Sequence, residues 1–344
     1  MNFETYLSET AKDVEQATNE ILDGWRKSVE QTHPALVQLA NAFIASCQGG
    51  KRLRGMLVRL GYELTAGEFN TEALKAAAAF EIFHAAILAH DDVIDKSPMR
   101  RGKPSLFQAL GGDHYGISQT ISLGDIGFFL AVNTVAGSNY PAGRKNEALK
   151  IFTDCMIDTG VGELLDVVLP HEEELPSEND VLTVMRLKTA KYSISSPLKV
   201  GAVLAGADDR LLQVLGEFGE NVGIAYQIQD DILGIFGTEE DLGKSVTSDI
   251  EEGKNTLLYL YALDKANEEQ KKVLNKHYGR GKVLLTEVEK IKEVFEKTGA
   301  VEYANFVGKG YLQKGEALIP EITKDPGLQI LLKEMIEFLV ERKK

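Results

Sequence analysis

The sequence contains few cysteines and few prolines. Its two cysteines, Cys47 and Cys155, are far apart and lie in apolar surroundings, so we expect buried free thiols rather than a disulfide. Only nine prolines occur in 344 residues, which leaves room for long helices because proline breaks helix interiors. No uninterrupted apolar run approaches the ~20 residues of a membrane span, and the first residues lack the basic start and apolar run of a signal peptide. We therefore expect a cytoplasmic protein without a transmembrane segment.

Positive charge is also in short supply. The chain has 38 Lys and Arg against 52 Asp and Glu, a net charge of −14. A nucleic-acid-binding protein would usually carry a basic face, so we expect no nucleic-acid partner. Local basic clusters can still bind small anions, because a nearby cation or metal outweighs the global charge.

Most of the chain has helical periodicity, and strand-like alternation is rare. Periodic apolar positions fill 3–31, 51–66, 71–95, 116–136, 142–167, 177–206, 209–233, 252–265, 283–318 and 325–343. Ser177 and Asp180 have the spacing of a helix capping box. No linker or change in composition divides the chain. The pattern predicts one all-α domain over residues 1–344, a bundle of about ten or more helices.

One predicted helix is apolar around its whole circumference and then ends in carboxylates. The segment "ALKAAAAFEIFHAAILAH", 73–90, has the composition of a helix buried in a bundle. It continues into "DDVID", where Asp91 and Asp95 are at i and i+4 on one face. An acidic helix end on a solvated surface is the plain alternative, but a buried helix makes it the weaker one. A hard divalent cation suits such carboxylates, and magnesium commonly binds one or two of them together with substrate phosphates.

A second cluster repeats this arrangement. The largely apolar segment "GIAYQIQDDILGIFG", 223–237, contains Asp230 and Asp231. Facing helices of a bundle can build one metal site between them, so the two clusters predict a single cavity lined by carboxylates.

Basic residues accompany both clusters. They are Lys51 and Arg54 in "QGGKRLRGML", Arg100 and Arg101 in "MRRGKP", Lys188 beside Thr189 in "RLKTAKY", and Lys244 and Lys254 in "DLGKSVTSDIEEGKNT". Any one of them alone is more often a solvated surface charge. Together, beside glycines and aspartates, they indicate a site for diphosphate groups, which lysine and arginine bind by charge-assisted hydrogen bonds.

These motifs resemble the trans-isoprenyl diphosphate synthases, or polyprenyl synthetases. The resemblance rests on "GGKRLR", "DDVID" with "RRGKPS", "SLGD", "KTA", "YQIQDDILG" and "GK…D…EGKNT", which follow one another in the family's order from about residue 35 to 260. It implies an all-α isoprenoid synthase bundle around a central cavity. It also implies head-to-tail trans condensation of an allylic diphosphate with isopentenyl diphosphate, with two or three Mg²⁺ ions per active site, in a homodimer.

The resemblance also implies residue roles. Asp91 and Asp95 would hold magnesium with Asp92 in support, and Asp230 would hold a further ion. The implied contacts of the allylic substrate are Arg100, Lys188, Thr189, Gln227, Lys244 and Lys254. Those of isopentenyl diphosphate are Lys51, Arg54, His84 and Arg101. We take Asp91, Asp92, Asp95, Asp230, Lys188 and Lys244 as the catalytic set.

Three positions depart from the family pattern. Gly234 stands where a third aspartate of the second cluster is common, and Gly55 stands where proline is usual. Glu163 replaces a common glutamine and adds a carboxylate with no evident role.

Product length depends in this family on side-chain bulk below the first aspartates. Ala86 is small, Ile87 is of medium size, and Phe83 is bulky and about one turn deeper. Farnesyl diphosphate makers tend to have an aromatic residue at the position of Ala86. We therefore expect geranylgeranyl diphosphate as the product, with geranylfarnesyl or longer chains, or farnesyl diphosphate, as alternatives.

Two other functions have to be weighed. A class I terpene cyclase uses similar aspartates, but it would not need the isopentenyl diphosphate contacts Lys51, Arg54 and Arg101. A non-catalytic synthase subunit would be expected to lose aspartates or lysines that this chain keeps.

Overall fold

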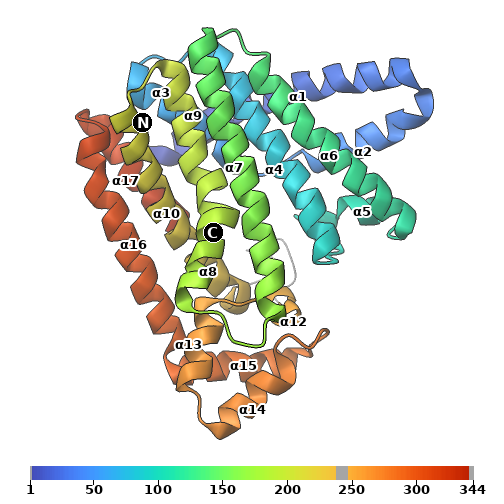
Figure 1. The fold of residues 1–344 in the computed structure, drawn as a ribbon, viewed down its shortest axis with the longest axis vertical. Helices are drawn as coiled ribbons and strands as arrows, with labels where there is room; N and C mark the ends of the chain where they lie inside the picture. Colours follow the sequence, from blue (N-terminus) through green and yellow to red (C-terminus); the bar gives the residue numbers. More distant parts are fainter. Residues whose placement is uncertain (1, 238–246, 341–344) are drawn as a thin grey trace. The chain divides into compact units, whose positions relative to one another are not determined.

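The computed structural model describes residues 2–237 and 247–340, and these are almost entirely helical. The first helices are α1 (Phe3–Thr32), α2 (Val37–Ser46), α3 (Leu53–Ala66), α4 (Leu74–Ile94), α5 (Leu106–Ala109), α6 (His114–Ala136) and α7 (Ala142–Val168). They are followed by α8 (Glu178–Val184), the π-helix η4 (Met185–Ser195), α9 (Ser196–Ala205) and α10 (Asp209–Phe236). The last are α12 (Ser248–Glu252), α13 (Leu257–Lys265), α14 (Glu268–His277), α15 (Leu285–Thr298), α16 (Ala300–Ile322) and α17 (Pro326–Val340). Short 3₁₀ turns occupy Pro34–Leu36, Thr71–Ala73 and Leu169–His171, and β1 (Met99–Arg100) pairs with β2 (Lys103–Pro104). The predicted all-α class is confirmed (Figure 1).

The helices form two compact units, each made of separate stretches of chain. Unit 1 comprises residues 1–155, 193–216 and 320–334, and unit 2 comprises 156–192, 217–319 and 335–344. The expectation of one domain over 1–344 stays a prediction.

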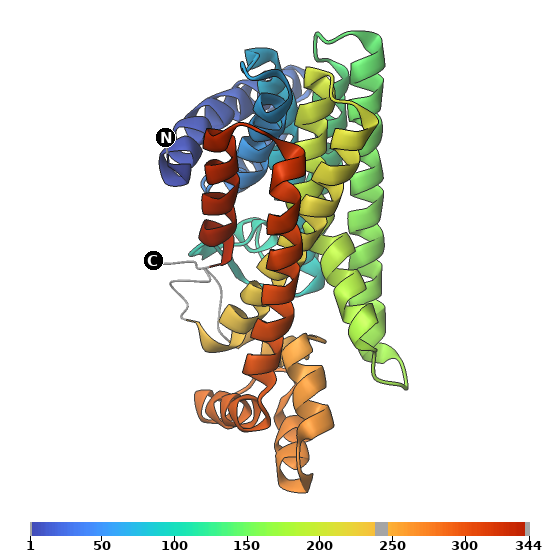
Figure 2. The ribbon, with the colours of Figure 1, turned by 90° about the vertical axis from the view of Figure 1, so that its left-hand side faces the viewer.

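Unit 1 is held together by close helix crossings. Helix α3 packs on α9 and on α4, and α4 packs on α6. A Cβ atom at Gly61 would collide with the carbonyl oxygen of Leu198, and one at Gly201 with that of Val58, so at this crossing α3 and α9 touch through their backbones. Figure 2 shows α1 and α3, in blue, beside each other, in agreement with their packing contact.

Helix α4 lies at the centre of unit 1, where Phe80, Ile82 and Ala86 are fully buried. Together with the preceding turn it is the one described helix that is long and apolar enough to cross a membrane by length and composition, but 67% of that apolar window is buried inside the protein. The core helix of a soluble protein meets the same criterion. The absence of a transmembrane segment stays a prediction.

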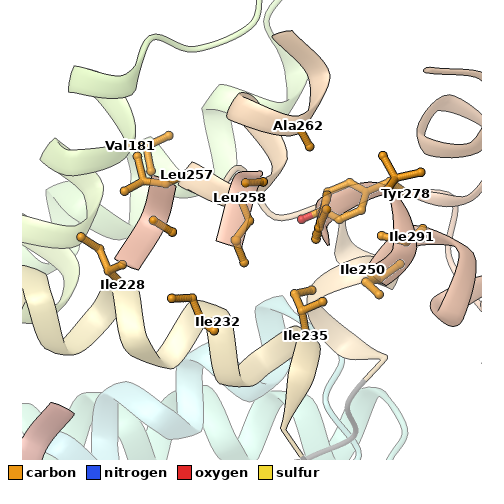
Figure 3. Packing of buried hydrophobic residues seen from close by; sticks show 14 of the residues in the cluster. Val181, Ile228, Ile232, Ile235, Ile250, Leu257, Leu258, Ala262, Tyr278 and Ile291 are labelled. Carbon is orange, nitrogen blue, oxygen red and sulfur yellow. The ribbon is translucent and has the colours of Figure 1, made fainter. Parts of the chain in front are cut away.

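Unit 2 has its own apolar core. Ile228, Ile232 and Ile235 of α10 pack with residues of α8, α12, α13 and α15 (Figure 3). Their spacing of three to four residues places them on one face of the helix. Helix α15 also packs on α13 and α14. This core holds α10, and therefore its aspartates, against the segments around it.

Local signals explain where several helices begin and end. Ser177 and Asp180 form the predicted capping box at the start of α8, which confirms that prediction. Gly299 has a φ of 76° and ends α15, so the predicted helix 283–318 is two helices. The predicted helix 177–206 is also divided, because η4 lies between α8 and α9.

Both cysteines are free and buried, as predicted. Burial raises the pKa of the Cys47 thiol to about 12. A thiol in such an apolar setting is unreactive at neutral pH.

Candidate active site

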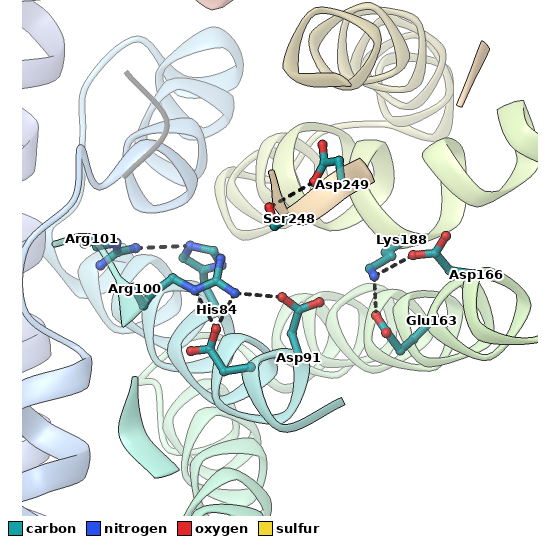
Figure 4. Close-up of polar contacts among 10 residues, drawn as sticks. His84, Asp91, Arg100, Arg101, Glu163, Asp166, Lys188, Ser248 and Asp249 are labelled. Atoms are coloured by element: carbon teal, nitrogen blue, oxygen red, sulfur yellow. Dashed lines mark hydrogen bonds and ion pairs between the residues drawn. The ribbon is translucent and has the colours of Figure 1, made fainter. Parts of the chain in front are cut away.

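The first aspartate cluster lies at the end of α4 and is bound by one arginine. Asp92 is buried, and Arg100 donates from Nε to Asp92 Oδ1 over 2.8 Å and from Nη2 to Asp91 Oδ2 over 3.0 Å (Figure 4). Burial raises the pKa of Asp92 to about 6, although Arg100 acts in the opposite direction. Asp95 follows as the C-cap residue, directly after the last residue of the helix. The structure therefore brings Asp91, Asp92 and Arg100 together at this end of the helix.

A two-residue hairpin aims the paired arginines at different partners. Arg100 pairs with Lys103 across the strands, and Arg101 and Gly102 between them have φ values of 52° and 71°. Positive φ at both central residues is the geometry of the tight turn that suits strand twist. Arg100 therefore reaches the aspartates, while Nη2 of Arg101 lies 3.3 Å from Nε2 of His84.

Arg101 also contacts the glycine-rich loop that precedes α3. Its Nη1 donates to the carbonyl oxygens of Gln48 and Gly49, each over 3.3 Å. Gly50 has a φ of 84°, which favours glycine, and a Cβ atom there would lie 3.2 Å from the guanidinium carbon, so this glycine eases the approach of the arginine. Lys51 follows in the same loop. The structure thus brings Arg101 to the loop that carries Lys51.

Arg54 and His84 complete this basic group. Arg54 Nη2 donates to Ser193 Oγ over 2.7 Å. Burial, and then the cations of Arg54 and Arg101, lower the pKa of His84 well below its usual value. His84 is therefore neutral at pH 7 and can accept a hydrogen bond from Arg101.

The sequence analysis missed the residues that hold this loop in place. Arg52 is 3% exposed, donates from Nη1 to the carbonyl oxygen of Cys47 over 2.9 Å, and lies 3.7 Å from Glu81. Glu81 Oε1 accepts from the backbone N–H of Gly55 over 2.9 Å. Proline has no N–H and could not make this bond, which gives Gly55 a physical reason. The signal was available, because a carboxylate within an apolar helix needs a partner.

The second cluster lies in unit 2 and is a chain of hydrogen bonds. Thr189 Oγ1 donates to Gln227 Oε1, and Gln227 Nε2 donates to Asp231 Oδ1, each over 2.8 Å. Lys254 Nζ lies 3.3 Å from the same Asp231 oxygen. Burial raises the pKa of Asp231, against the effect of Lys254. A cavity of about 70 Å³ is lined by these four residues and by Lys188.

Glu163, which had no role in the sequence analysis, is an ion-pair partner of Lys188. Lys188 Nζ lies 2.9 Å from Glu163 Oε2 and 2.8 Å from Asp166 Oδ2 (Figure 4). A Cβ atom on Gly162 would lie 2.5 Å from the backbone nitrogen of Lys188, so that glycine allows α7 to approach η4 closely. Asp166 was also missed by the sequence analysis.

The space beside Gly234 is already filled. A Cβ atom there would collide with Oδ2 of Asp249, a buried side chain of α12. Asp230, four residues earlier on α10, is half-buried. Lys244 lies outside the described residues.

The three positions assigned to product length lie on α4 in unit 1. Phe83 packs against Phe128 and Phe152, with ring centroids 5.5 and 5.9 Å apart. Ala86 faces α6, where a Cβ atom on Gly127 would lie 2.8 Å from its methyl group. Ile87 is half-buried. The apolar wall below the aspartates is therefore aromatic at the depth of Phe83.

Comparison with known proteins shows that the similarity inferred from the sequence motifs covers nearly the whole chain. The polyprenyl synthetase family model matches residues 36–298. The geranylgeranyl diphosphate synthase of Sulfolobus acidocaldarius is 30% identical, with 99% of each chain covered. The geranylfarnesyl diphosphate synthase of Aeropyrum pernix is 31% identical over 86% of this chain and 91% of its own.

The fold is also similar to that of a solved structure. The geranylgeranyl pyrophosphate synthase of Corynebacterium glutamicum, complexed with isoprenyl diphosphate and magnesium, has a TM-score of 0.92 and 26% identity, with 100% of both chains covered. The isoprenoid synthase fold and the resemblance inferred from the motifs are both confirmed. This chain belongs to the polyprenyl synthetase family.

Proposed function

We propose that this protein is a trans-prenyltransferase that joins an allylic diphosphate to isopentenyl diphosphate head-to-tail and releases inorganic diphosphate. The observation that carries the proposal is the hairpin of unit 1. It directs Arg100 to the aspartates of α4 and Arg101 to His84 and the glycine-rich loop. Arg100 with the aspartates suits a diphosphate that is bound through magnesium. Arg101 with His84 and the loop suits a diphosphate that is bound by cations of the protein alone.

The donors of the aspartate clusters fit magnesium. Carboxylate oxygens are hard ligands, and magnesium needs only one or two of them when phosphates supply the rest. Within residues 2–237 and 247–340, no group of three or more His, Cys, Asp or Glu side chains could hold a metal by itself. We assign Asp91, Asp95 and Asp230 as ligands of two or three Mg²⁺ ions. Bound magnesium would supply Lewis-acid stabilisation of the leaving diphosphate.

The basic residues would divide between the two substrates. Arg100, Lys188, Thr189, Gln227, Lys244 and Lys254 would bind the allylic diphosphate, and Lys51, Arg54, His84 and Arg101 would bind isopentenyl diphosphate. Lys188 is already held by Glu163 and Asp166, which fix its position before a phosphate arrives. Gln227 is oriented by Thr189 on one side and Asp231 on the other. The apolar residues of α4 would keep water from a reactive allylic cation.

Geranylgeranyl diphosphate is the proposed product. Ala86 and Ile87 leave less bulk near the aspartates than an aromatic residue would, and Phe83 lies deeper. The similarity to geranylgeranyl diphosphate synthases supports this length, while the similarity to a geranylfarnesyl diphosphate synthase keeps a longer product as the alternative.

We also propose a cytoplasmic homodimer that functions as one domain. Ile157, Val161, Leu164 and Val168 recur at helical spacing on α7, and all four are exposed, Leu164 by 67%. An exposed apolar stripe of this kind favours burial against another chain. Light scattering of the purified protein tests the dimer, and Leu164→Lys should shift it toward monomer while Lys150→Gln, an exposed change on the same helix, should not.

The reaction is tested by incubating the protein with Mg²⁺, labelled isopentenyl diphosphate and, in separate experiments, dimethylallyl, geranyl or farnesyl diphosphate. These three allylic substrates differ from one another by one five-carbon unit at a time. Elongated prenyl alcohols after dephosphorylation support the proposal, and their size gives the product length. Cyclic or linear hydrocarbon without elongation would indicate a cyclase. A folded protein without turnover would indicate a partner subunit.

Two arginine variants test the division of roles. Arg101→Met should raise KM for isopentenyl diphosphate by about tenfold or more, as expected for the loss of a charged hydrogen bond, with less effect on the allylic substrate. Arg100→Met should raise KM for the allylic diphosphate, with less effect on KM for isopentenyl diphosphate. Arg210→Met, at a guanidinium that is 80% exposed, serves as the control.

A further inference from the structure

Unit 1 contains a second cavity, beside the candidate active site. It lies between α2, the last turns of α4, and the segment from the β1–β2 hairpin to α5, and has a volume of about 250 Å³. Ligand pockets for drug-sized molecules are usually about 300–1,000 Å³. The size therefore suits a smaller molecule, such as one short chain with a head group.

The cavity opens on a different face of α4 from the one that carries the proposed substrate contacts. Ala85, Ala89 and Asp92 line it, and their spacing of i, i+4 and i+7 places them on one face. His84 and Asp91 each precede one of these residues, about 100° away around the helix. The α4 side of the cavity is thus separate from His84 and Asp91, whereas Arg100 and Arg101 border both the cavity and the proposed diphosphate contacts.

Most of the cavity wall is apolar. Alanine methyl groups come from α2, α4 and α5, among them Ala45, Ala85 and Ala109, and Leu106 adds a larger side chain. Such a wall binds hydrocarbon, because each buried CH₂ contributes about 0.8 kcal/mol. It offers little to a polar ligand such as a sugar or a nucleotide base.

Cations stand at the same cavity. Arg101 and Lys103 line it, and both are exposed. Lys103 makes no ion pair with another residue in the described ranges. A lysine at the rim of an apolar pocket favours an anionic head group over a neutral one.

A buried hydroxyl group provides the independent sign of a ligand. Ser105 lines the cavity and is 1% exposed, yet its Oγ has no hydrogen-bond partner among residues 2–237 and 247–340. It does not cap α5 either. Leaving a buried hydroxyl unsatisfied costs about 1–3 kcal/mol, so such groups in native proteins call for an explanation. An oxygen atom of a ligand would satisfy it.

We propose that this cavity is a binding site for a small anionic amphiphile, a phosphate or carboxylate head on a short hydrocarbon chain. The alanine wall would take the chain, and Lys103 with Ser105 would bind the head. Asp92 and Arg100 form part of the wall, so the ligand would contact the ion pair that holds the first aspartate cluster.

Calorimetric titration of the full chain with octyl phosphate, without magnesium or substrates, tests the site. We expect octyl phosphate or octanoate to bind at least tenfold more tightly than both 1-octanol and inorganic phosphate. The tighter of the two anions identifies the head group. Equal binding of 1-octanol would overturn the role of the cations, and equal binding of inorganic phosphate would overturn the role of the alanine wall.

Variants locate the binding. Ala45→Leu narrows the cavity at an exposed position of α2 and should weaken octyl phosphate binding by at least tenfold, and Lys103→Gln by about threefold or more. Lys27→Gln, an exposed lysine of α1, is the matched control and should change nothing. Unchanged affinity in both Ala45→Leu and Lys103→Gln would overturn the proposal, because octyl phosphate would then bind elsewhere.

Ser105→Ala separates a ligand role from a structural one. Removing an unsatisfied hydroxyl should leave the free energy of unfolding unchanged or raise it, while the affinity for octyl phosphate falls. A loss of stability with unchanged affinity would show that Ser105 serves the fold alone.

Discussion

Arg52 and Glu81 form an ion pair in the core of unit 1, with 3.7 Å between Nη1 and Oε2 and side chains that are 3% and 5% exposed. Arg52 also has a φ of 53°, a left-handed conformation that a non-glycine residue adopts only when its surroundings hold it there. The pair joins the loop before α3 to α4. It therefore fixes the positions of the two neighbours of Arg52 in the chain, which are Lys51 and Leu53.

Removing Glu81 should therefore be costly. Glu81→Ala removes the buried partner of the Arg52 charge and should lower the free energy of unfolding by about 3–5 kcal/mol. Urea denaturation measures this. Glu15→Ala is the matched control, because Glu15 also lies 3.7 Å from Arg52 but is 44% exposed, and an exposed pair contributes about 1 kcal/mol or less. Equal losses in the two variants would contradict the role of burial.

His84 should make stability depend on pH. Its pKa is lowered in the folded protein, mainly by burial, whereas in the unfolded chain it titrates near its ordinary value of about 6.5. Below that pH the unfolded state binds more protons, so stability falls as pH falls toward the folded pKa. Between pH 7.5 and 5.5, the free energy of unfolding of His84→Gln should fall by about 1 kcal/mol less than that of the parent protein. Urea denaturation at the two pH values measures this. A pH dependence of stability in His84→Gln equal to that of the parent protein would contradict this role of His84.

The missing third aspartate cannot simply be restored. Gly234→Asp would place a side chain where Asp249 lies and a negative charge beside that buried carboxylate, so it should lower the free energy of unfolding by about 3 kcal/mol or more. Thermal or urea unfolding checks this. Gly308→Ala is the control, since a Cβ atom there would make an ordinary contact of 3.5 Å with Ile228. A stable Gly234→Asp variant would show that Asp249 can move aside.

Ala86→Phe should shorten the prenyl product, measured as the size of the dephosphorylated alcohol. Because Ala86 faces Gly127 across the α4–α6 contact, the larger ring should also lower stability by about 1–3 kcal/mol. Ile87→Leu conserves volume at the next position and should leave the product unchanged. A stable Ala86→Phe variant with an unchanged product would remove the argument that this position limits chain length.

The sequence predicted the structure best where a long apolar run indicated a buried helix. The apolar run 73–90 predicted a buried helix, and α4 ends at Ile94 within the DDVID motif. The helices α2 and α14 were not predicted; each has only 10 residues, which is shorter than the stretch over which helical periodicity is recognised. The partners of the charged residues could not be predicted either. Glu163 and Lys188 are far apart in sequence, and only packing of α7 on η4 brings them together.

The π-helix η4 has a consequence for how function could be lost in this protein. Lys188 and Thr189 lie within it, and each of its turns contains more residues than an α-helical turn. A deletion of one residue there would allow ordinary α-helical hydrogen bonding with α8 and α9 kept in register, but it would change the directions in which Lys188 and Thr189 point. The helix content would hardly change, so circular dichroism would report an intact protein. The segment is therefore a point at which the chain can stay folded and yet lose the alignment of its lysine and threonine.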